Sequence, residues 1–355
     1  MLLRIGRTVL LPLVVAFLAV AVLLATSSAD VTDARPRRTP RPTATLHATP
    51  IATPRPTPKP TPTPTPRPTP TPTPTPTATS NPGSCTLFPA NNVWNKDISG
   101  LPVRTDSTAL LTTIGLSTGL HPDFSNAGAY GIPYNIVGPS TPRYTVGFYY
   151  PTESDPGPYP IPANPLIEAP TDSHLLAWDT SACFLYEIFD ASVSGGVWSG
   201  GSGAIWDLRS NALRPDGWTS ADAAGLPILP GLVRYDEVAA GLIAHALRFT
   251  APRTQTAHIY PARHDAGSSS SASYPPMGLR VRLKASVNIS GFGPQARVLL
   301  TALQHYGMIL ADNGSAWYIS GAPSPSWNDD ELHLLNQITG SMFEAVDTSG
   351  LVNGP

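Results

Sequence analysis

The sequence has little charge, few cysteines and none of the short signatures that mark common enzyme classes. Only 13% of the 355 residues are charged, and the formal net charge is -2. The chain lacks the basic field that a nucleic-acid-binding surface requires, so we expect no nucleic-acid partner. Gly-x-Ser-x-Gly, His-Glu-x-x-His, phosphate-loop and Cys-x-x-Cys patterns are absent, which removes motif-based support for the corresponding hydrolases, zinc proteases, nucleotidases and redox proteins.

Residues 1–30 combine a short basic start with a long apolar run. Arg4 and Arg7 precede 18 residues without charge. This run is longer than a usual signal-peptide core of about 7–15 residues and lies at the lower limit for a spanning helix. Ser27–Ala29 would suit a cleavage site. A cleaved signal peptide and a membrane anchor both remain open, and both place the rest of the chain outside the cytoplasm.

Residues 31–83 form a tract rich in proline and threonine. Proline fixes φ and removes backbone donors, so we expect a disordered linker with extended polyproline II character. At about 3.1 Å per residue, forty such residues could span on the order of 100 Å. The linker would hold the following domain away from a membrane or cell wall.

The two cysteines, Cys85 and Cys183, both follow this linker. An even number of cysteines in an oxidising compartment favours one disulfide, and the alternative is two buried free thiols. In the chain-entropy model, closing a loop of that size contributes about 4 kcal/mol.

Residues 84–355 read as one β-rich globular domain. Short runs of β-branched and aromatic residues alternate with glycine and proline, which predicts a β-sandwich or jelly roll with two or three short helices. In "GLRVRLKA", leucine and valine would be buried and the basic residues exposed. The helices are expected at Pro294–Tyr306, after an N-cap at Asn328, and as one turn at Ser220–Ala224. The expected strands are Tyr144–Tyr150, Leu175–Trp178, Cys183–Asp190, Ala204–Leu208, Leu242–Phe249, His258–Tyr260, Leu279–Leu283, Met308–Ala311, Trp317–Ser320 and Phe343–Val346.

Acidic residues gather in and around the stretch Gly203–Gly225. Glycoside hydrolysis requires two carboxyl groups, and our preferred pair is Asp207 and Asp222, with Asp312 as a substitute that can also bind substrate. Arg209 lies two residues after Asp207 and would clamp the substrate, because alternate residues of an extended chain share a face. Each residue also has a structural alternative. Asp207 and Arg209 could form an internal ion pair, Asp222 could be an acid at a helix start, and Asp312 could belong to a hairpin turn at "DNG".

Histidines and a tryptophan complete the candidate site. His121 and His264 lie in loop-like sequence and could carry protons or orient other groups. Asp123, Arg263 and Trp218 would bind substrate, the tryptophan by packing on a sugar ring. Trp198, Trp218 and Trp327 lie in Gly-, Ser- or Pro-rich surroundings that favour exposure. His245 reads as a strand histidine with its hydrogen bonds satisfied.

A metal site would need three or four converging ligands. His121, Asp123 and His264 could supply them, but their spacing does not indicate that they converge. We therefore expect no metal and no other cofactor.

The stretches "DLRSNALRPDGWTSADAAGLPILPGLVRYDE" and "YGMILADNGSAWYISGAPSPSWNDDEL" resemble secreted bacterial β-rich proteins of unassigned function. The resemblance covers most of residues 85–347 and implies an extracytoplasmic location. It assigns a role to no residue.

These features predict an extracytoplasmic carbohydrate-active enzyme, a glycoside hydrolase or polysaccharide lyase. It would be a monomer, displayed on the linker of residues 31–83. Its partner would be a polysaccharide or cell-wall glycan. The alternative is a surface module that binds glycan or wall material without catalysis. A protease or amidase is less favoured, because no Ser/His/Asp spacing singles out a nucleophile.

Overall fold

The computed structural model describes residues 85–126, 130–169 and 172–351, and these form a mainly β structure. Fifteen strands in four sheets are accompanied by a few short helices, so the predicted fold class is confirmed. The predictions for residues 1–30 and 31–83 lie outside the described residues. Among the described helices, none is both long and apolar enough to cross a membrane.

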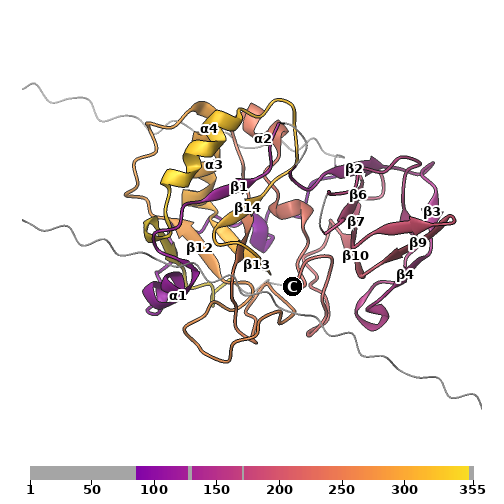
Figure 1. The fold of residues 1–355 in the computed structure, drawn as a ribbon, viewed down its shortest axis with the longest axis horizontal. Helices are drawn as coiled ribbons and strands as arrows, with labels where there is room; N and C mark the ends of the chain where they lie inside the picture. The colour runs from indigo at the N-terminus through magenta and orange to yellow at the C-terminus, as the bar shows by residue number, and fades with distance from the viewer. Residues whose placement is uncertain (1–84, 127–129, 170–171, 352–355) are drawn as a thin grey trace, which may run out of the picture. The chain divides into compact units, whose positions relative to one another are not determined.

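A six-stranded sheet carries most of the main hydrophobic core (Figure 1). Its order is β1–β14–β11–β13–β12–β15; β1 with β14 and β11 with β13 pair in parallel, and the other pairs are antiparallel. Parallel neighbours are usually covered on both faces, and β11 and β13 consist mostly of buried residues. The strands are β1 (His121–Asp123), β11 (Leu247–Ala251), β12 (Arg280–Leu283), β13 (Met308–Asn313), β14 (Tyr318–Ser320) and β15 (Phe343–Ala345).

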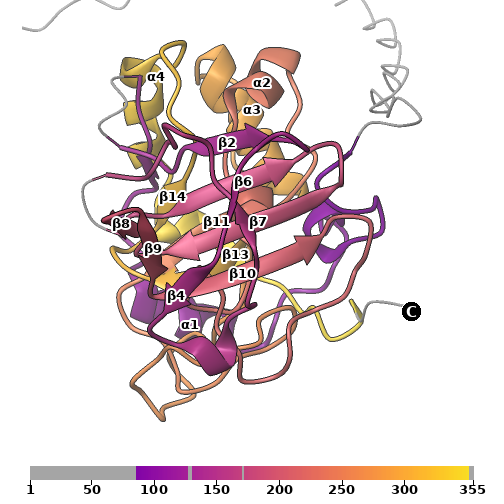
Figure 2. The ribbon, with the colours of Figure 1, turned by 90° about the vertical axis from the view of Figure 1, so that its right-hand side faces the viewer.

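A four-stranded sheet with the order β10–β7–β6–β2 separates this core from a second, smaller one. Successive residues of a strand face opposite sides, so Leu176 joins the main core while Leu175 joins the second. Two small sheets, β3–β5 and β4–β9–β8, contribute to the second core. Figure 2 shows β4, β9 and β8 in front of the four-stranded sheet. The strands are β2 (Tyr134–Val137), β3 (Arg143–Tyr144), β4 (Val146–Phe148), β5 (Tyr159–Pro160), β6 (Leu175–Asp179), β7 (Phe184–Phe189), β8 (Ser192–Ser194), β9 (Val197–Gly200) and β10 (Ser202–Asp207).

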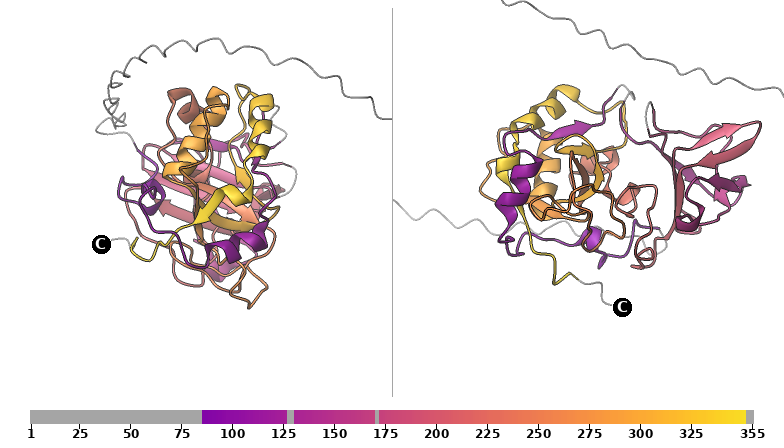
Figure 3. Two further views of the ribbon diagram at one scale, coloured as in Figure 1. Left: turned by 90° about the vertical axis from the view of Figure 1, so that its left-hand side faces the viewer. Right: turned by 60° about the horizontal axis from the view of Figure 1, so that its bottom comes forward.

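The longer helices lie on the side of the six-stranded sheet that faces away from the four-stranded sheet (Figures 1 and 3). The two predicted helices are confirmed: Pro294 occupies the first turn of α3, and the Asn328 side chain caps α4 by accepting from the Glu331 N–H. The helices are α1 (Ser107–Ile114), α2 (Tyr235–Ala240), α3 (Pro294–His305) and α4 (Asp329–His333), with 3-10 turns at Val93–Asn95, Pro151–Glu153, Leu229–Gly231, Leu334–Gln337 and Gly340–Met342.

Three local predictions are wrong. Of Leu242–Phe249, only the part from Leu247 onward is a strand, because the preceding residues connect it to α2. His258–Tyr260 makes one isolated bridge, and Pro261 has no N–H with which to continue a ladder. Ser220–Ala224 forms bends and a turn instead of a helix.

The expected exposed face of β12 is also wrong. Arg280 is 1% exposed and donates to the backbone carbonyls of Val93, Lys96 and Tyr306. Burial lowers its pKa to about 9. The Arg282 side chain is buried as well, and it pairs with Glu344. Both cations lie under the segment before α1, which the alternation of residues could not reveal.

The predicted disulfide is confirmed. Cys85 and Cys183 are joined, with 98 residues of sequence separation and Cα atoms 5.3 Å apart. The bond ties the start of the described chain to the turn before β7, which leads into the wall of the candidate site.

Candidate functional site

A pocket of about 390 Å³ opens between the four-stranded sheet and the end of β13. This volume is in the range of roughly 300–1,000 Å³ that is typical of ligand sites. Phe189 of β7 and Ser202 of β10 line one side, and Asp312 at the end of β13 lines the other. The segment Thr219–Ala223 runs between them. We call this the acidic pocket.

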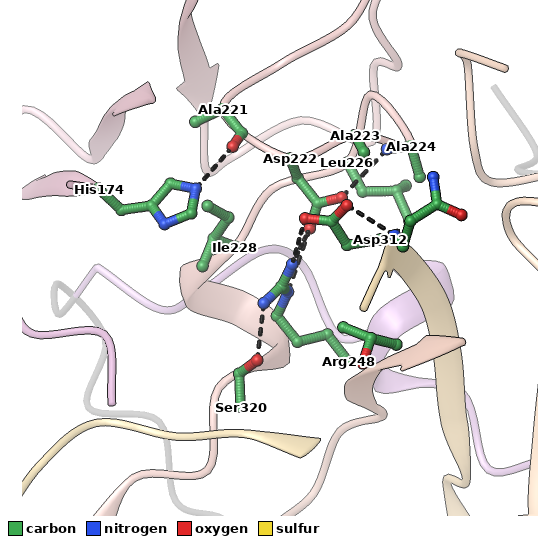
Figure 4. A network of polar contacts seen from close by, with 12 residues as sticks. His174, Ala221, Asp222, Ala223, Ala224, Leu226, Ile228, Arg248, Asp312 and Ser320 are labelled. Carbon is green, nitrogen blue, oxygen red and sulfur yellow. Dashed lines mark hydrogen bonds and ion pairs between the residues drawn. The ribbon is translucent and has the colours of Figure 1, made fainter. Parts of the chain in front are cut away.

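Arg248 holds two carboxylates together beside the acidic pocket (Figure 4). Its Nε and Nη2 donate to Asp222 Oδ2 at 3.1 and 2.8 Å, and its Nη1 donates to the Ser320 hydroxyl at 2.7 Å. The same Nη2 lies 3.8 Å from Asp312 Oδ2. Because one nitrogen lies 2.8 Å from Asp222 Oδ2 and 3.8 Å from Asp312 Oδ2, these two oxygens lie no more than about 6.6 Å apart. Carboxyl pairs are about 5–5.5 Å apart in retaining glycosidases and about 6.5–9.5 Å apart in inverting ones.

Local hydrogen bonds bring Asp222 and Asp312 together. The Ser220 hydroxyl accepts from the Asp222 N–H at 2.9 Å, and Asp222 Oδ1 accepts from the Ala224 N–H at 3.1 Å. The Ala224 N–H also points at the carbonyl of Ala311, 2.9 Å away, in the residue before Asp312. The turn at residues 222–225 is thereby fastened to the end of β13.

The predicted hairpin turn at Asp312–Gly314 is wrong. β11 lies between β13 and β14, so these two strands are not neighbours in the sheet. Asp312 and Asn313 instead end β13, and both side chains reach the acidic pocket.

Burial and mutual charge shift the pKa values of Asp222, Asp312 and Arg248. Burial and the Asp222 charge raise the pKa of Asp312 to about 7, although Arg248 opposes the rise. Burial also raises the pKa of Asp222. Burial would lower the pKa of Arg248, but Asp222 and Asp312 raise it, so the guanidinium stays charged. Near neutral pH the group therefore carries one firmly held cation and an Asp312 that can give or take a proton.

Glu153 and His264 face each other across another part of the acidic pocket. His264 Nδ1 lies 2.8 Å from the Ala223 carbonyl, which can only accept, so Nδ1 carries the proton. The other ring nitrogen, Nε2, is 4.0 Å from Glu153 Oε2. Glu153 is held by the Thr219 N–H at 3.2 Å.

A buried histidine lies behind the pocket wall. His174 Nε2 is 3.0 Å from the Ala221 carbonyl, and Nδ1 makes a very short contact with Glu168. Burial would lower the pKa of His174, but Glu168 raises it above its ordinary value. Ligand atoms of Glu168, Asp172 and His174 lie within 4.8 Å of one another and could hold a metal ion, but both His174 nitrogens already have partners.

The structure brings Asp222, Asp312 and His264 to the acidic pocket, but not Asp207. Asp207 pairs with Arg209, Oδ1 to Nε at 2.8 Å, and lines a separate pocket with Arg214. Arg209 is exposed and lies over the Phe184 ring. The expected pairing of Asp207 with Asp222 is therefore absent, because the strand end turns Asp207 to its own sequence neighbour.

The remaining predicted residues do not line the acidic pocket. Arg263 bonds Asp216 and the Arg214 carbonyl, and Trp218 is half-buried under the Arg214 guanidinium. His121 and Asp123 line a second pocket.

The expected exposure of two tryptophans is wrong. Trp198 and Trp327 belong to the two hydrophobic cores, despite their Gly-, Ser- and Pro-rich neighbours. Tyr149 and Tyr150 are among the exposed aromatic residues of the described chain, at 78% and 47%, and Tyr150 lines the acidic pocket.

Sequence reasoning also missed Arg248, Glu153 and Glu168. Arg248 lies in the apolar strand β11, and a cation at such a position is a usable signal, since a buried arginine needs a carboxylate partner. Glu153 and Glu168 gave no comparable signal.

In comparisons with protein-family models, curated proteins and solved structures, nothing matches this chain. The function of the site is therefore inferred from its own geometry and charge.

Proposed function

We propose that this protein is an extracytoplasmic enzyme that hydrolyses a glycan in the acidic pocket. One observation carries the proposal: Arg248 holds Asp222 and Asp312 together where Asp312 reaches the pocket with a pKa of about 7. Catalytic acids require a pKa near the working pH, and such shifts concentrate at functional sites.

The exposure of each side chain decides whether it can contact the substrate. Asp312 is 27% exposed and would donate a proton to the glycosidic oxygen. Asp222 has no exposed side-chain surface, so it is a positioning residue whose charge raises the proton affinity of Asp312, while Arg248 opposes the rise. A water molecule would attack the anomeric carbon, and His264 Nε2 or Glu153 would accept the proton of that water.

The charge of the pocket favours hydrolysis over a lyase reaction on uronates. Glu153, Asp172, Asp222 and Asp312 line it, and none of its described lining residues is lysine or arginine. Arg248 pairs with Asp222, and Asp312 is protonated when it acts as the general acid. Glu153 and Asp172 therefore supply the negative charge of this lining. A lyase must neutralise the uronate carboxylate, whereas these two carboxylates repel an anion. Arg248 cannot serve, because its side chain is 4% exposed and already paired. A neutral sugar, or one that carries an amino group, suits the pocket better.

The rim offers a surface for sugar rings. Tyr150 lines the pocket, and the ring of Tyr149 packs edge-on against it at 4.7 Å. Exposed tyrosines combine an apolar face with a polar tip, which suits the alternating faces of a pyranose. The Cys85–Cys183 disulfide is compatible with the proposed location outside the cytoplasm.

The test is release of reducing ends from a panel of neutral and amino-sugar polysaccharides. We expect Asp312→Asn to lower kcat by about 100-fold or more, the usual contribution of a general acid. Asp207→Asn is the matched control, since it removes an aspartate outside the pocket. An equal loss of kcat in both variants, or an unchanged kcat in Asp312→Asn, would refute the role of Asp312 as general acid. Binding of a glycan without any product would favour a non-catalytic module.

A further inference from the structure

A second pocket, of about 530 Å³, lies over the edge of the six-stranded sheet. The strands β1 and β14 supply one wall, and α4 with the turn that follows it supplies the other. Leu120 and Leu332 are buried beneath it, while Asp123 and Asp329 place carboxylates at its sides. An apolar floor with a few polar groups is the usual make-up of a ligand site.

The wall formed by the strands is a pair of stacked aromatic rings. Because β1 and β14 pair in parallel, His121 is the register partner of Tyr318. Their ring centroids are 4.0 Å apart and their planes differ by 25°. Burial lowers the pKa of His121, so the imidazole is neutral at neutral pH. Tyr130, which is 60% exposed, lines the same pocket.

Arg248 lies between the second pocket and the acidic pocket. In the β1–β14 register Asp123 is the partner of Ser320, whose hydroxyl accepts from Arg248 Nη1 at 2.7 Å. The other end of the guanidinium binds Asp222 and approaches Asp312. Two buried side chains, those of Ser320 and Arg248, thus lie between Asp123 of the second pocket and Asp222 of the acidic pocket.

We propose that the second pocket is a remote subsite, which binds another sugar unit of the glycan chain that is cleaved in the acidic pocket. This inference rests on the proposed function. The ligand is a neutral oligosaccharide long enough to reach both pockets, with one ring packed on His121 and Tyr318 and its hydroxyls bonded to Asp123 or Asp329. His121 and Asp123 then bind substrate and take no part in the chemistry.

The test is the dependence of affinity on chain length, measured without turnover. Cello-, xylo- and N-acetylchito-oligosaccharides of two to six units are titrated calorimetrically into Asp312→Asn. We expect the six-unit chain of one series to bind at least about tenfold more tightly than its two-unit chain, a difference of about 1.4 kcal/mol. In that background Tyr318→Leu should abolish the gain, whereas Tyr318→Phe, which keeps the ring, should retain it.

Tyr274→Leu is the matched control, because Tyr274 packs on Arg253 and lines neither pocket. If Tyr318→Leu folds poorly, the ring resonances of His121 in Asp312→Asn replace it, and they should shift with the six-unit chain. A gain that survives in Tyr318→Leu, unshifted His121 resonances, or no binding and no length dependence in the panel would overturn the subsite.

The failure of the subsite differs from the failure of the enzyme. Product release by the wild-type protein without any gain from chain length would refute the subsite alone. A gain from length that depends on Tyr318, with no product from any glycan, would refute catalysis and keep the binding groove.

Discussion

Arg248→Met tests whether the buried ion pair with Asp222 holds the acidic pocket together. The two side chains are 4% and 0% exposed and their closest charged atoms are 2.8 Å apart. Methionine fills similar space, so the change mainly leaves the Asp222 charge with the Ala224 N–H alone. Leaving one buried charge unpaired costs about 3–5 kcal/mol. At about 2–4 °C per kcal/mol for a domain of this size, Tm should fall by roughly 10 °C.

The loss should also depend on pH. Burial already raises the pKa of Asp222, and without Arg248 the main opposing charge is gone. A carboxyl group whose pKa is higher in the folded state binds its proton more tightly there. Its contribution is fully present below the unfolded pKa of about 3.9 and is lost as the pH rises through the folded pKa. The Tm deficit of Arg248→Met relative to wild type should therefore be larger at pH 8 than at pH 5.

The assay is thermal unfolding followed by circular dichroism at both pH values. Arg209→Met is the control, because it removes the same kind of cation from an exposed pair, and such pairs contribute little. Adding Asp222→Asn to Arg248→Met should restore part of the lost Tm, since no unpaired charge then remains buried. Equal deficits for the two arginines, or a deficit that is independent of pH and not rescued, would refute the reasoning.

Three further outcomes are expected. Hydrolysis should fall as the pH rises through about 7, because Asp312 then loses the proton that it donates, and a pH–rate profile that stays flat above pH 7 would contradict this. Burial raises the pKa of Glu187 to about 7, so its contribution to stability is lost between its unfolded pKa of about 4.3 and 7. The unfolding free energy measured in urea should therefore change less between pH 5 and pH 8 for Glu187→Gln than for wild type. Replacing Cys85 and Cys183 together with serine should lower the unfolding free energy by about 4–5 kcal/mol in the chain-entropy model, and an unchanged urea midpoint would contradict that value.

Local patterns located most of the regular elements. The caps and apolar spacing of α3 and α4 depend on residues within one or two turns, and both helices form where predicted. The strands β6, β7 and β10 likewise follow short apolar runs. The failures occur where neighbours distant in sequence decide the outcome: the alternation in β12 cannot show that distant carbonyls surround Arg280.

The candidate site shows the same division. Asp222 was predicted in a helical turn, Asp312 in a hairpin turn and His264 in loop-like sequence, and folding brings the three to one pocket. Asp207 stood out equally but pairs with Arg209 elsewhere. The pairing of Asp207 is local, two residues along the chain, whereas Asp222 and Asp312 meet only through the fastening of Ala224 to Ala311, almost ninety residues apart.

The sequence by itself determined the mainly β class, the capped helices and the disulfide, since these depend on composition, on short-range periodicity and on a single pair of cysteines. Only the tertiary structure decided which charges are buried together. Arg248, Asp222 and Asp312 come from three separate segments, and their proton affinities depend on distances of a few ångströms and on exclusion of water. Neither quantity exists until the sheets have packed.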